Sequence, residues 1–335
     1  MSVDRLVVVG ASSGGIEALG ALNAALPPDF AAPICIVSHT APESPPVLDQ
    51  ILTRAGNLPA SMARTGDRLR PGHLYVAPPD HHLLIEPGAV CLSRGPRENR
   101  FRPAIDPLFR SAAQVYGPRA IGVVLTGNLD DGAAGLWAIR RLGGVAVVQD
   151  PATALVPSMP ANALRRVPDA HVVPIDELAA FLQQVLATSV YDGPLVPLPH
   201  VEVEMRIAND QPPLPAGLLS IASPSTYTCP ECHGALLALK EDEQVRYRCH
   251  TGHAYSPESL LADLAESIEH ALGSAERALQ EAALLMRQIG TDLDSDVDRD
   301  LIAHLRAEAD RATSQAQVVR GVLSDRPALG VLRRA

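Results

Sequence analysis

Four side chains that together could cleave an ester or an amide follow three predicted strands. Ser12 lies in the glycine-rich turn Gly10–Gly15, between a short β-branched run and a helical pattern. His39 follows a second buried strand, and Asp130 and Asp131 follow a third. A hydroxyl nucleophile, an imidazole base and a carboxylate that orients the base are the components of acyl transfer. The residue types therefore favour a serine hydrolase.

Each of these residues also has a structural interpretation. A serine in such a turn can cap a helix or bind a phosphate, and an aspartate before Gly132 can cap the next helix. The turn also resembles that of short-chain dehydrogenases, but Ile16 stands at the place of the third glycine. His39 stands where those proteins carry an acidic residue, and Lys240, the only lysine, forms no Tyr-x-x-x-Lys pair. These departures favour acyl transfer over dinucleotide binding.

Residues 1–189 must supply the scaffold that brings these side chains together. Strands are predicted at Arg5–Val9, Ile34–Ser38, His73–Ala77, Gly122–Thr126 and Val145–Val148. Helices are predicted at Gly15–Leu26, Pro46–Ala55, Pro107–Tyr116, Ala133–Leu142 and Ile175–Thr188, and a hairpin joins Leu83–Ile85 to Ala89–Leu92. This alternation is typical of an α/β fold with a doubly wound, mostly parallel, Rossmann-like sheet, whose ligands bind beyond the carboxyl ends of the strands.

The remaining chain divides into three predicted segments. Many prolines in residues 190–226 predict a semi-extended linker. Residues 227–256 form a small Cys/His-rich unit, and residues 257–325 repeat apolar side chains every three or four positions. That spacing predicts either a packed helical hairpin or a coiled coil that binds a protein partner.

The Cys/His-rich unit has the spacing of a metal site. Cys229, Cys232, Cys249 and His253 give the pattern C-x2-C-x16-C-x3-H, which suits tetrahedral zinc. His250 is the alternative fourth ligand. Since protein side chains fill every position, the zinc is expected to be structural, and no cofactor is expected for catalysis.

Composition restricts the partners. The formal net charge of −10 over 335 residues argues against nucleic-acid binding, which normally uses a basic surface. The apolar runs are too short for a signal peptide or a membrane span, so we expect no membrane insertion and a cytoplasmic location.

Residues 1 to about 188 resemble the catalytic domain of the CheB-type chemotaxis protein-glutamate methylesterases. The resemblance rests on motifs that agree in order and spacing: Gly10–Gly15, Ser38-His39, Pro71–Pro78, Arg102–Phe109, Leu125–Gly127 with Asp131–Gly135, and Met159-Pro160.

The resemblance implies a catalytic triad of Ser12, His39 and Asp131. Ser12 would attack the side-chain carbonyl of a methylated glutamate, His39 would pass the proton to the departing methanol, and Asp131 would orient the imidazole. The family also deamidates certain receptor glutamines through the same intermediate. The implied partner is a methylated chemoreceptor or a similar protein.

Several positions bear on the substrate. The backbone amides of Ser13 and of the Gly14-Gly15 turn are candidates for the oxyanion hole. Asn128 and Leu129 replace a methionine and a glycine of the family pattern. These two changes keep open an alternative function, that of a catalytically retired adaptor that works through the C-terminal segments. Arg102 is a candidate substrate contact within an arginine-rich segment that could bind an acidic partner: Arg94, Arg97, Arg100 and Arg102.

The resemblance begins at the first predicted strand, so we expect no phosphorylation of a receiver domain in cis.

Overall fold

The computed structural model describes residues 4–190, 198–241, 244–293 and 299–324. The chain divides into two compact units, Met1–Ser259 and Leu260–Ala335. Within the described residues, no helix combines the length and the apolar character that a bilayer span requires.

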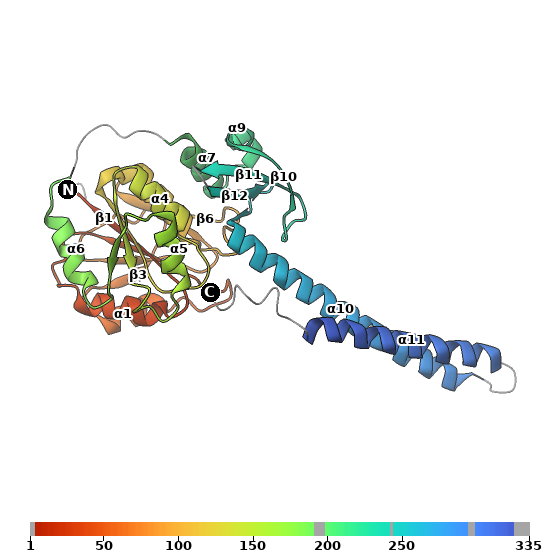
Figure 1. The fold of residues 1–335 in the computed structure, drawn as a ribbon. Helices are drawn as coiled ribbons and strands as arrows, with labels where there is room; N and C mark the ends of the chain where they lie inside the picture. Colours follow the sequence, from red (N-terminus) through yellow and green to blue (C-terminus); the bar gives the residue numbers. More distant parts are fainter. Residues whose placement is uncertain (1–3, 191–197, 242–243, 294–298, 325–335) are drawn as a thin grey trace. The chain divides into compact units, whose positions relative to one another are not determined.

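A seven-stranded sheet forms the centre of the first unit (Figure 1). Each neighbouring pair in it runs parallel. From one edge to the other its strands are β3 (Ala60–Met62), β4 (Leu74–Val76), β2 (Ile34–Ser38), β1 (Leu6–Ala11), β7 (Ala120–Val124), β8 (Val145–Gln149) and β9 (His171–Val173). The parallel α/β prediction is confirmed.

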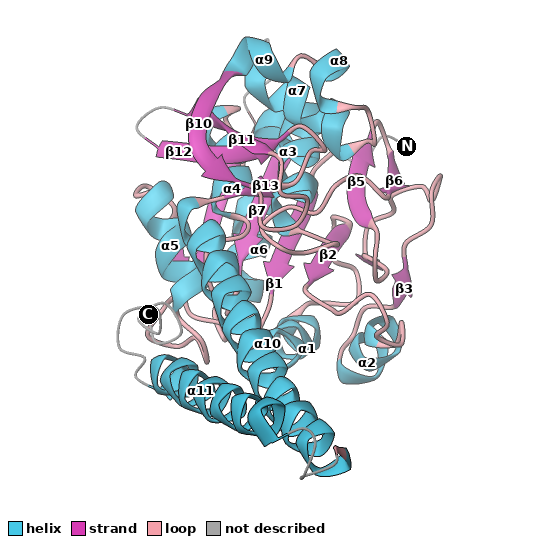
Figure 2. Ribbon diagram, turned by 90° about the vertical axis from the view of Figure 1, so that its right-hand side faces the viewer, coloured by secondary structure: helices cyan, strands magenta, loops and turns pink. Residues whose placement is uncertain are grey.

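Helices cover both faces of this sheet (Figure 2). Leu6 and Val8 of β1 pack in one core cluster, and Val7 and Val9 pack in another. The first cluster includes α3 (Ile105–Tyr116), α4 (Ala133–Arg141) and α5 (Ser158–Arg166), and the second includes α1 (Gly15–Ala25), α2 (Leu48–Ala55) and α6 (Leu178–Ala187). Burial of alternate side chains on both faces explains why the central strands read as uninterrupted apolar runs.

Some elements differ from the prediction. The short strands β3 and β9 and the helix α5 were not predicted, because three-residue strands and a helix that contains Pro160 give weak local signals. The hairpin is confirmed as β5 (His82–Glu86) and β6 (Ala89–Ser93). A short 3-10 helix, Gly117–Arg119, precedes β7.

The interpretation of residues 190–226 as a semi-extended linker is wrong for the part that the structure describes, 198–226. This part contains α7 (Pro199–Ala208), α8 (Pro213–Ala216), α9 (Leu218–Ile221) and most of β10 (Ala222–Thr228). Pro199 and Pro213 begin helices, where a missing amide proton costs nothing. Residues 191–197 lie outside the described residues.

The Cys/His-rich unit lies on a second, antiparallel sheet, formed in the order β10, β11 (Ala235–Glu241), β12 (Gln244–Cys249) and β13 (Ala254–Tyr255). It belongs to the same compact unit as the central sheet.

The second unit is a helical hairpin, as predicted. It comprises most of α10 (Pro257–Asp292) and all of α11 (Arg299–Ser324). Arg287 pairs with Asp310, and Glu276 pairs with Arg320, which is the register of two antiparallel helices. Ala283, Ala309 and Ala312 pack between them.

Candidate active site

The tight turn between β1 and α1 carries Ser12 at the carboxyl edge of the central sheet. The backbone amide of Ser12 donates to the carbonyl of Thr126, at 3.0 Å, which joins this turn to the loop after β7. Gly14 has φ 75°, and a Cβ there would lie 2.8 Å from Leu155. A Cβ on Gly127 would lie 2.7 Å from the Cβ of Ser12. The glycines therefore allow the turn that carries Ser12 and the loop after β7 to lie in contact.

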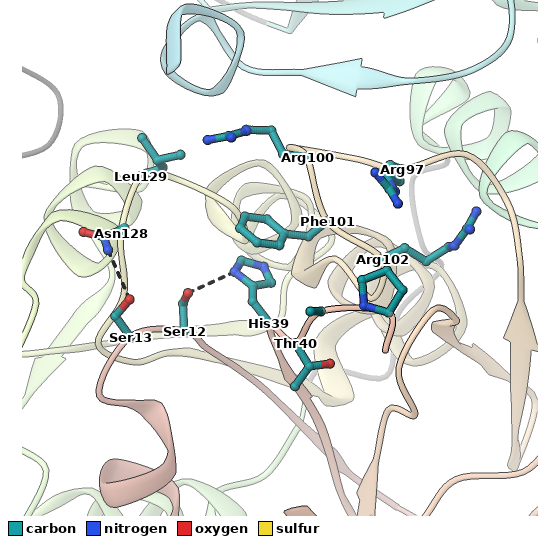
Figure 3. A pocket seen from close by; sticks show the side chains of 12 residues that line it. Ser12, Ser13, His39, Thr40, Arg97, Arg100, Phe101, Arg102, Asn128 and Leu129 are labelled. Carbon is teal, nitrogen blue, oxygen red and sulfur yellow. Dashed lines mark hydrogen bonds between the residues drawn. The ribbon is translucent and has the colours of Figure 1, made fainter. Parts of the chain in front are cut away.

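His39 follows β2 and lies between Ser12 and Asp131. Its Nδ1 is 3.1 Å from Ser12 Oγ (Figure 3), and its Nε2 is 2.7 Å from Asp131 Oδ2. The ring stacks on Phe101, with centroids 3.8 Å apart and an interplanar angle of 4°. Serine proteases use Nε2 toward the serine, so the two ring nitrogens exchange roles here. Either nitrogen can serve as the base when a carboxylate accepts the proton of the other.

Asp131 precedes α4 and is only 2% exposed. Besides His39, the amides of Ile105 and Asp106 at the start of α3 donate to it, at 2.7 and 3.2 Å. The side-chain amide of Asn99 donates to it at 2.9 Å. Burial alone would raise the pKa of Asp131, but His39 and these donors outweigh burial and hold that pKa below its ordinary value. The carboxylate therefore stays ionised beside the imidazole.

Ser12, His39 and Asp131 come from three strands at the point where the order of the sheet reverses. Ser12 follows β1, and the helix after it leads to β2 on one side. Asp131 follows β7, which pairs with β1 on the other side. Crevices at such a reversal are where open α/β sheets bind ligands.

Asn99 and Phe101 were missed by the sequence analysis. Both lie in the loop between β6 and α3, where no periodicity indicates a role. Asn99 adopts φ 49°, and Asn is among the few residues that tolerate this left-handed conformation. Phe101 lies one residue before the matched motif Arg102–Phe109, so only its contact with His39 identifies it.

A pocket of about 560 Å³ opens beside Ser12 (Figure 3). Its lining comprises Ser12, Ser13, His39, Thr40, Ala41, Pro42, Arg97, Arg100, Phe101, Arg102, Asn128 and Leu129. Asn128 donates its side-chain amide to Ser13 Oγ at 3.1 Å. Leu129 has φ 61°, an unfavourable conformation for leucine, and its carbonyl accepts from Asn162 at 2.7 Å. The two departures from the family pattern thus lie at the mouth of the site and leave the triad contacts intact.

The guanidinium of Arg102 is held by Asp80, in the loop between β4 and β5, and by two carbonyls of its own loop. It donates twice to Asp80, at 2.9 and 2.6 Å, and once each to the carbonyls of Arg94 and Gly95. It lines the pocket, but the expectation that it contacts substrate remains a prediction. Asp80 and Arg102 are 22 positions apart, so no local pattern in the sequence indicates their ion pair.

The oxyanion hole is expected at the start of α1. The amide of Gly15 donates to the carbonyl of Ser12 at 2.8 Å, which closes the turn and removes Gly15 from the candidates. The hydroxyl of Thr126 donates to the carbonyl of Ser13 at 2.9 Å. The amides of Ser13 and of Gly14 therefore remain the candidate donors.

Asp130, the neighbour of Asp131, accepts a hydrogen bond from the hydroxyl of Ser256 at 2.8 Å. Burial, followed by the charge of Glu258, raises the pKa of Asp130 to about 7. In an unfolded chain the pKa is about 3.9, so ionisation of Asp130 in the folded protein costs stability progressively as the pH rises from about 4 to 7.

Asp130→Asn keeps the acceptor for Ser256 and removes this charge. We expect it to raise the free energy of unfolding by about 2 kcal/mol at pH 8, and the gain to shrink toward zero near pH 4. Urea unfolding followed by the fluorescence of Trp137, the single tryptophan, measures both. An equal gain at both pH values would contradict the assigned titration.

The four predicted metal ligands lie together in the second sheet. The ligand atoms of Cys229, Cys232, Cys249 and His253 are all within 4.8 Å of one another. The Sγ atoms of Cys232 and Cys249 are 3.6 Å apart. Tetrahedral zinc with bonds of about 2.3 Å requires roughly 3.8 Å between sulfurs. His253 belongs to the group and presents Nδ1 to it, while its Nε2 lies 3.4 Å from Glu231. The donor set fits a structural metal ion.

Comparisons with known proteins agree on the first part of the chain. The family model described as CheB methylesterase matches residues 7–182. A protein-glutamate methylesterase/protein-glutamine glutaminase of Anaeromyxobacter dehalogenans is 42% identical over 54% of this chain. A protein of Leptospira interrogans, named a putative form of the same enzyme, is 41% identical over 52% of this chain. The aligned region spans 53% of the first relative and 90% of the second.

A solved structure agrees with the family match. The CheB methylesterase catalytic domain of Thermotoga maritima aligns with a TM-score of 0.52 and 31% sequence identity. The alignment covers 54% of this chain and 98% of that domain. Since the family model matches slightly more than half of its residues, the chain belongs to the CheB methylesterase family.

Proposed function

We propose that the chain is a serine esterase that hydrolyses glutamate methyl esters on chemoreceptor-type proteins and releases methanol. We propose that it also deamidates glutamine side chains by the same route. The observation that carries the proposal is the hydrogen-bonded series from Ser12 Oγ through His39 to Asp131. The names of the aligned relatives support the choice of substrate.

The mechanism follows from the two contacts of His39. Its Nδ1 takes the proton of Ser12 while Oγ attacks the ester carbonyl, and the imidazolium that forms is stabilised by Asp131. His39 then protonates the methoxide as the C–O bond breaks, which leaves a glutamyl ester on Ser12. Water, deprotonated by the same Nδ1, hydrolyses this ester and restores Ser12. With glutamine, ammonia leaves in place of methanol.

Charge around the pocket supports an acidic protein substrate. Arg97 and Arg100 line the pocket beside Arg102, whose own charge is paired with Asp80 (Figure 3). A methylated glutamate is neutral, but its unmodified neighbours in an acidic receptor helix carry negative charge. Arginines near the rim raise the rate at which such a segment associates, and this effect weakens with salt.

The test is methanol release from the methylated cytoplasmic fragment of a chemoreceptor, with the unmethylated fragment as control. We expect methanol from the methylated fragment only, and ammonia from a fragment that carries glutamine at the same positions. Methanol from free glutamate methyl ester but not from the receptor would reject the protein substrate. If methanol is released neither from the receptor fragment nor from free glutamate methyl ester, the result would favour the catalytically retired adaptor. The contacts among Ser12, His39 and Asp131 argue against that alternative.

We also propose that Cys229, Cys232, Cys249 and His253 bind one structural Zn²⁺. The structure describes all five cysteines and joins none of them in a disulfide, so the three cysteines of the cluster are available as metal ligands. Helix α11 exposes the apolar side chains of Val318 and Val322, which a protein partner could cover. The binding of such a partner stays a prediction.

Cys229→Ser tests the metal assignment. We expect zinc content to fall from about one ion per chain to near zero, because a serine hydroxyl is a poor zinc ligand at neutral pH. The sheet β10–β13 should then become sensitive to protease, while the fluorescence of Trp137 still reports a folded central sheet. Cys91→Ser is the matched control, since Cys91 lies in β6, outside the cluster. Full zinc content in Cys229→Ser would reject the assignment.

A further inference from the structure

The loop that orients Asp131 is bound to the strand that follows the metal ligand His253. Ala254, the next residue, donates its amide to the carbonyl of Arg97 at 3.1 Å. Its carbonyl accepts the amide of Asn99 at 2.8 Å. Through these two hydrogen bonds, strand β13 connects the metal site to the loop of residues 97–99.

The side chain of Asn99 bridges the same two regions. Its Nδ2 donates to Asp131 and to Asp106, at 2.9 Å each. Its Oδ1 accepts from the amide of Ser256 at 3.1 Å and from the hydroxyl of Ser259 at 3.2 Å. The donors of Ser256 and Ser259 fix the orientation of the Asn99 amide. If the amide were turned over, its NH₂ group would face these two donors and its oxygen would face the carboxylates. Asn99 is only 2% exposed, so water does not replace them freely.

Buried ion pairs hold the residue before Asn99. Glu98 is fully buried and pairs with Arg110 of α3 and with Arg248 of β12. Arg248 also pairs with Glu204 of α7 at 2.7 Å and precedes the metal ligand Cys249. Burial alone would raise the pKa of Glu98, but Arg110 and Arg248 outweigh it and hold that pKa below its ordinary value. Arg246 of β12 also pairs with Glu98, at 3.4 Å. Loss of an arginine of β12 would leave this buried cluster with less positive charge to balance its carboxylates, so these contacts couple the metal site to the loop.

We propose that the metal-bound sheet β10–β13, with the residues Ser256 and Ser259 that follow it, sets the rate of catalysis by holding Asn99 against Asp131. Asn99 is a positioning residue, since it acts on the imidazole only through the carboxylate. The inference rests on the proposed function and adds to it a dependence of turnover on the metal. When the metal leaves, Ser256 and Ala254 lose their fixed place, Asn99 turns, and Asp131 no longer aligns His39.

The first experiment removes the metal from the full chain with a chelator and returns Zn²⁺. Two rates are read: methanol release, and the modification of Ser12 by an organophosphonate, which needs an activated serine but no receptor. A charge-assisted hydrogen bond supports a ten- to hundredfold effect. We expect both rates to fall by that factor on chelation and to recover with Zn²⁺, with the KM for the receptor changed less than twofold.

The second experiment uses Asn99→Ala, with zinc bound. We expect zinc content to remain near one ion per chain, both rates to fall ten- to hundredfold at unchanged KM, and chelation to lower them little further. Asn57→Ala is the matched control, because Asn57 donates only to backbone carbonyls near α1 and is expected to keep the full response to chelator.

The outcomes separate the two proposals. Metal-dependent modification of Ser12 without methanol release would reject the methylesterase substrate and keep the inference. Modification rates that are equal with and without zinc, or normal in Asn99→Ala, would overturn the inference and keep the esterase. No modification of zinc-loaded wild type would overturn both.

Discussion

Ser12→Ala is expected to lower kcat for methanol release by about five to six orders of magnitude, with the residual rate about 10³-fold above that in water. Without Oγ no glutamyl ester can form, and His39 and Asp131 then contribute little because the triad acts as a unit. The measurement is methanol release from the methylated receptor fragment under saturating substrate.

The structure predicts that this substitution leaves the site in place. The amide of the residue at position 12 still donates to Thr126, and the Cβ of alanine occupies the place of the serine Cβ beside Gly127. Receptor binding, measured by calorimetry, should therefore be unchanged, and it serves as the control. A variant that keeps more than about one hundredth of the wild-type kcat would show that Ser12 is not the nucleophile.

Asp131→Asn is expected to lower kcat by about 10⁴-fold, the second largest effect. Asp131 Oδ1 accepts from Asn99, Asp106 and Gly132, so the carbonyl oxygen of an asparagine must face those three donors. Its NH₂ group then faces His39 Nε2. The imidazole must accept there and carry its proton on Nδ1, which is the wrong tautomer for a base toward Ser12.

The measurement compares kcat for Asp131→Asn and Asp130→Asn, two identical substitutions at adjacent positions. Asp130 makes no contact with His39, so its variant should keep kcat within a few fold of wild type. Equal losses of kcat in both variants would show that negative charge near the site supports catalysis and that the orientation of His39 by Asp131 does not.

The central strands could be predicted from sequence because both of their faces are buried. Their β-branched runs are uninterrupted, and β2 was predicted with the observed bounds, Ile34–Ser38. The edge strands β3 and β9 are short and packed less tightly, so local sequence carries little of their pairing. Residues 198–226 were misread because their prolines start helices, and only tertiary burial, as of Ile207, distinguishes this from an extended chain.

The proximity of Ser12, His39 and Asp131 could be predicted because the residues that follow parallel strands lie at one edge of the sheet. The residues alone left Asp130 and Asp131 as alternatives, and the family resemblance selected Asp131. The structure shows why the two differ: α3 and Asn99 supply donors to Asp131, while Asp130 turns toward Ser256. Those donors come from segments distant in sequence, and no local pattern indicates them.

The most direct test of the central claim is mass spectrometry of the zinc-loaded wild-type chain after reaction with an organophosphonate. We expect one adduct per chain, located on Ser12, and slower labelling when the methylated receptor fragment is present but not when the unmethylated fragment is. Methanol release that continues after complete labelling, or an adduct on a residue other than Ser12, would contradict it.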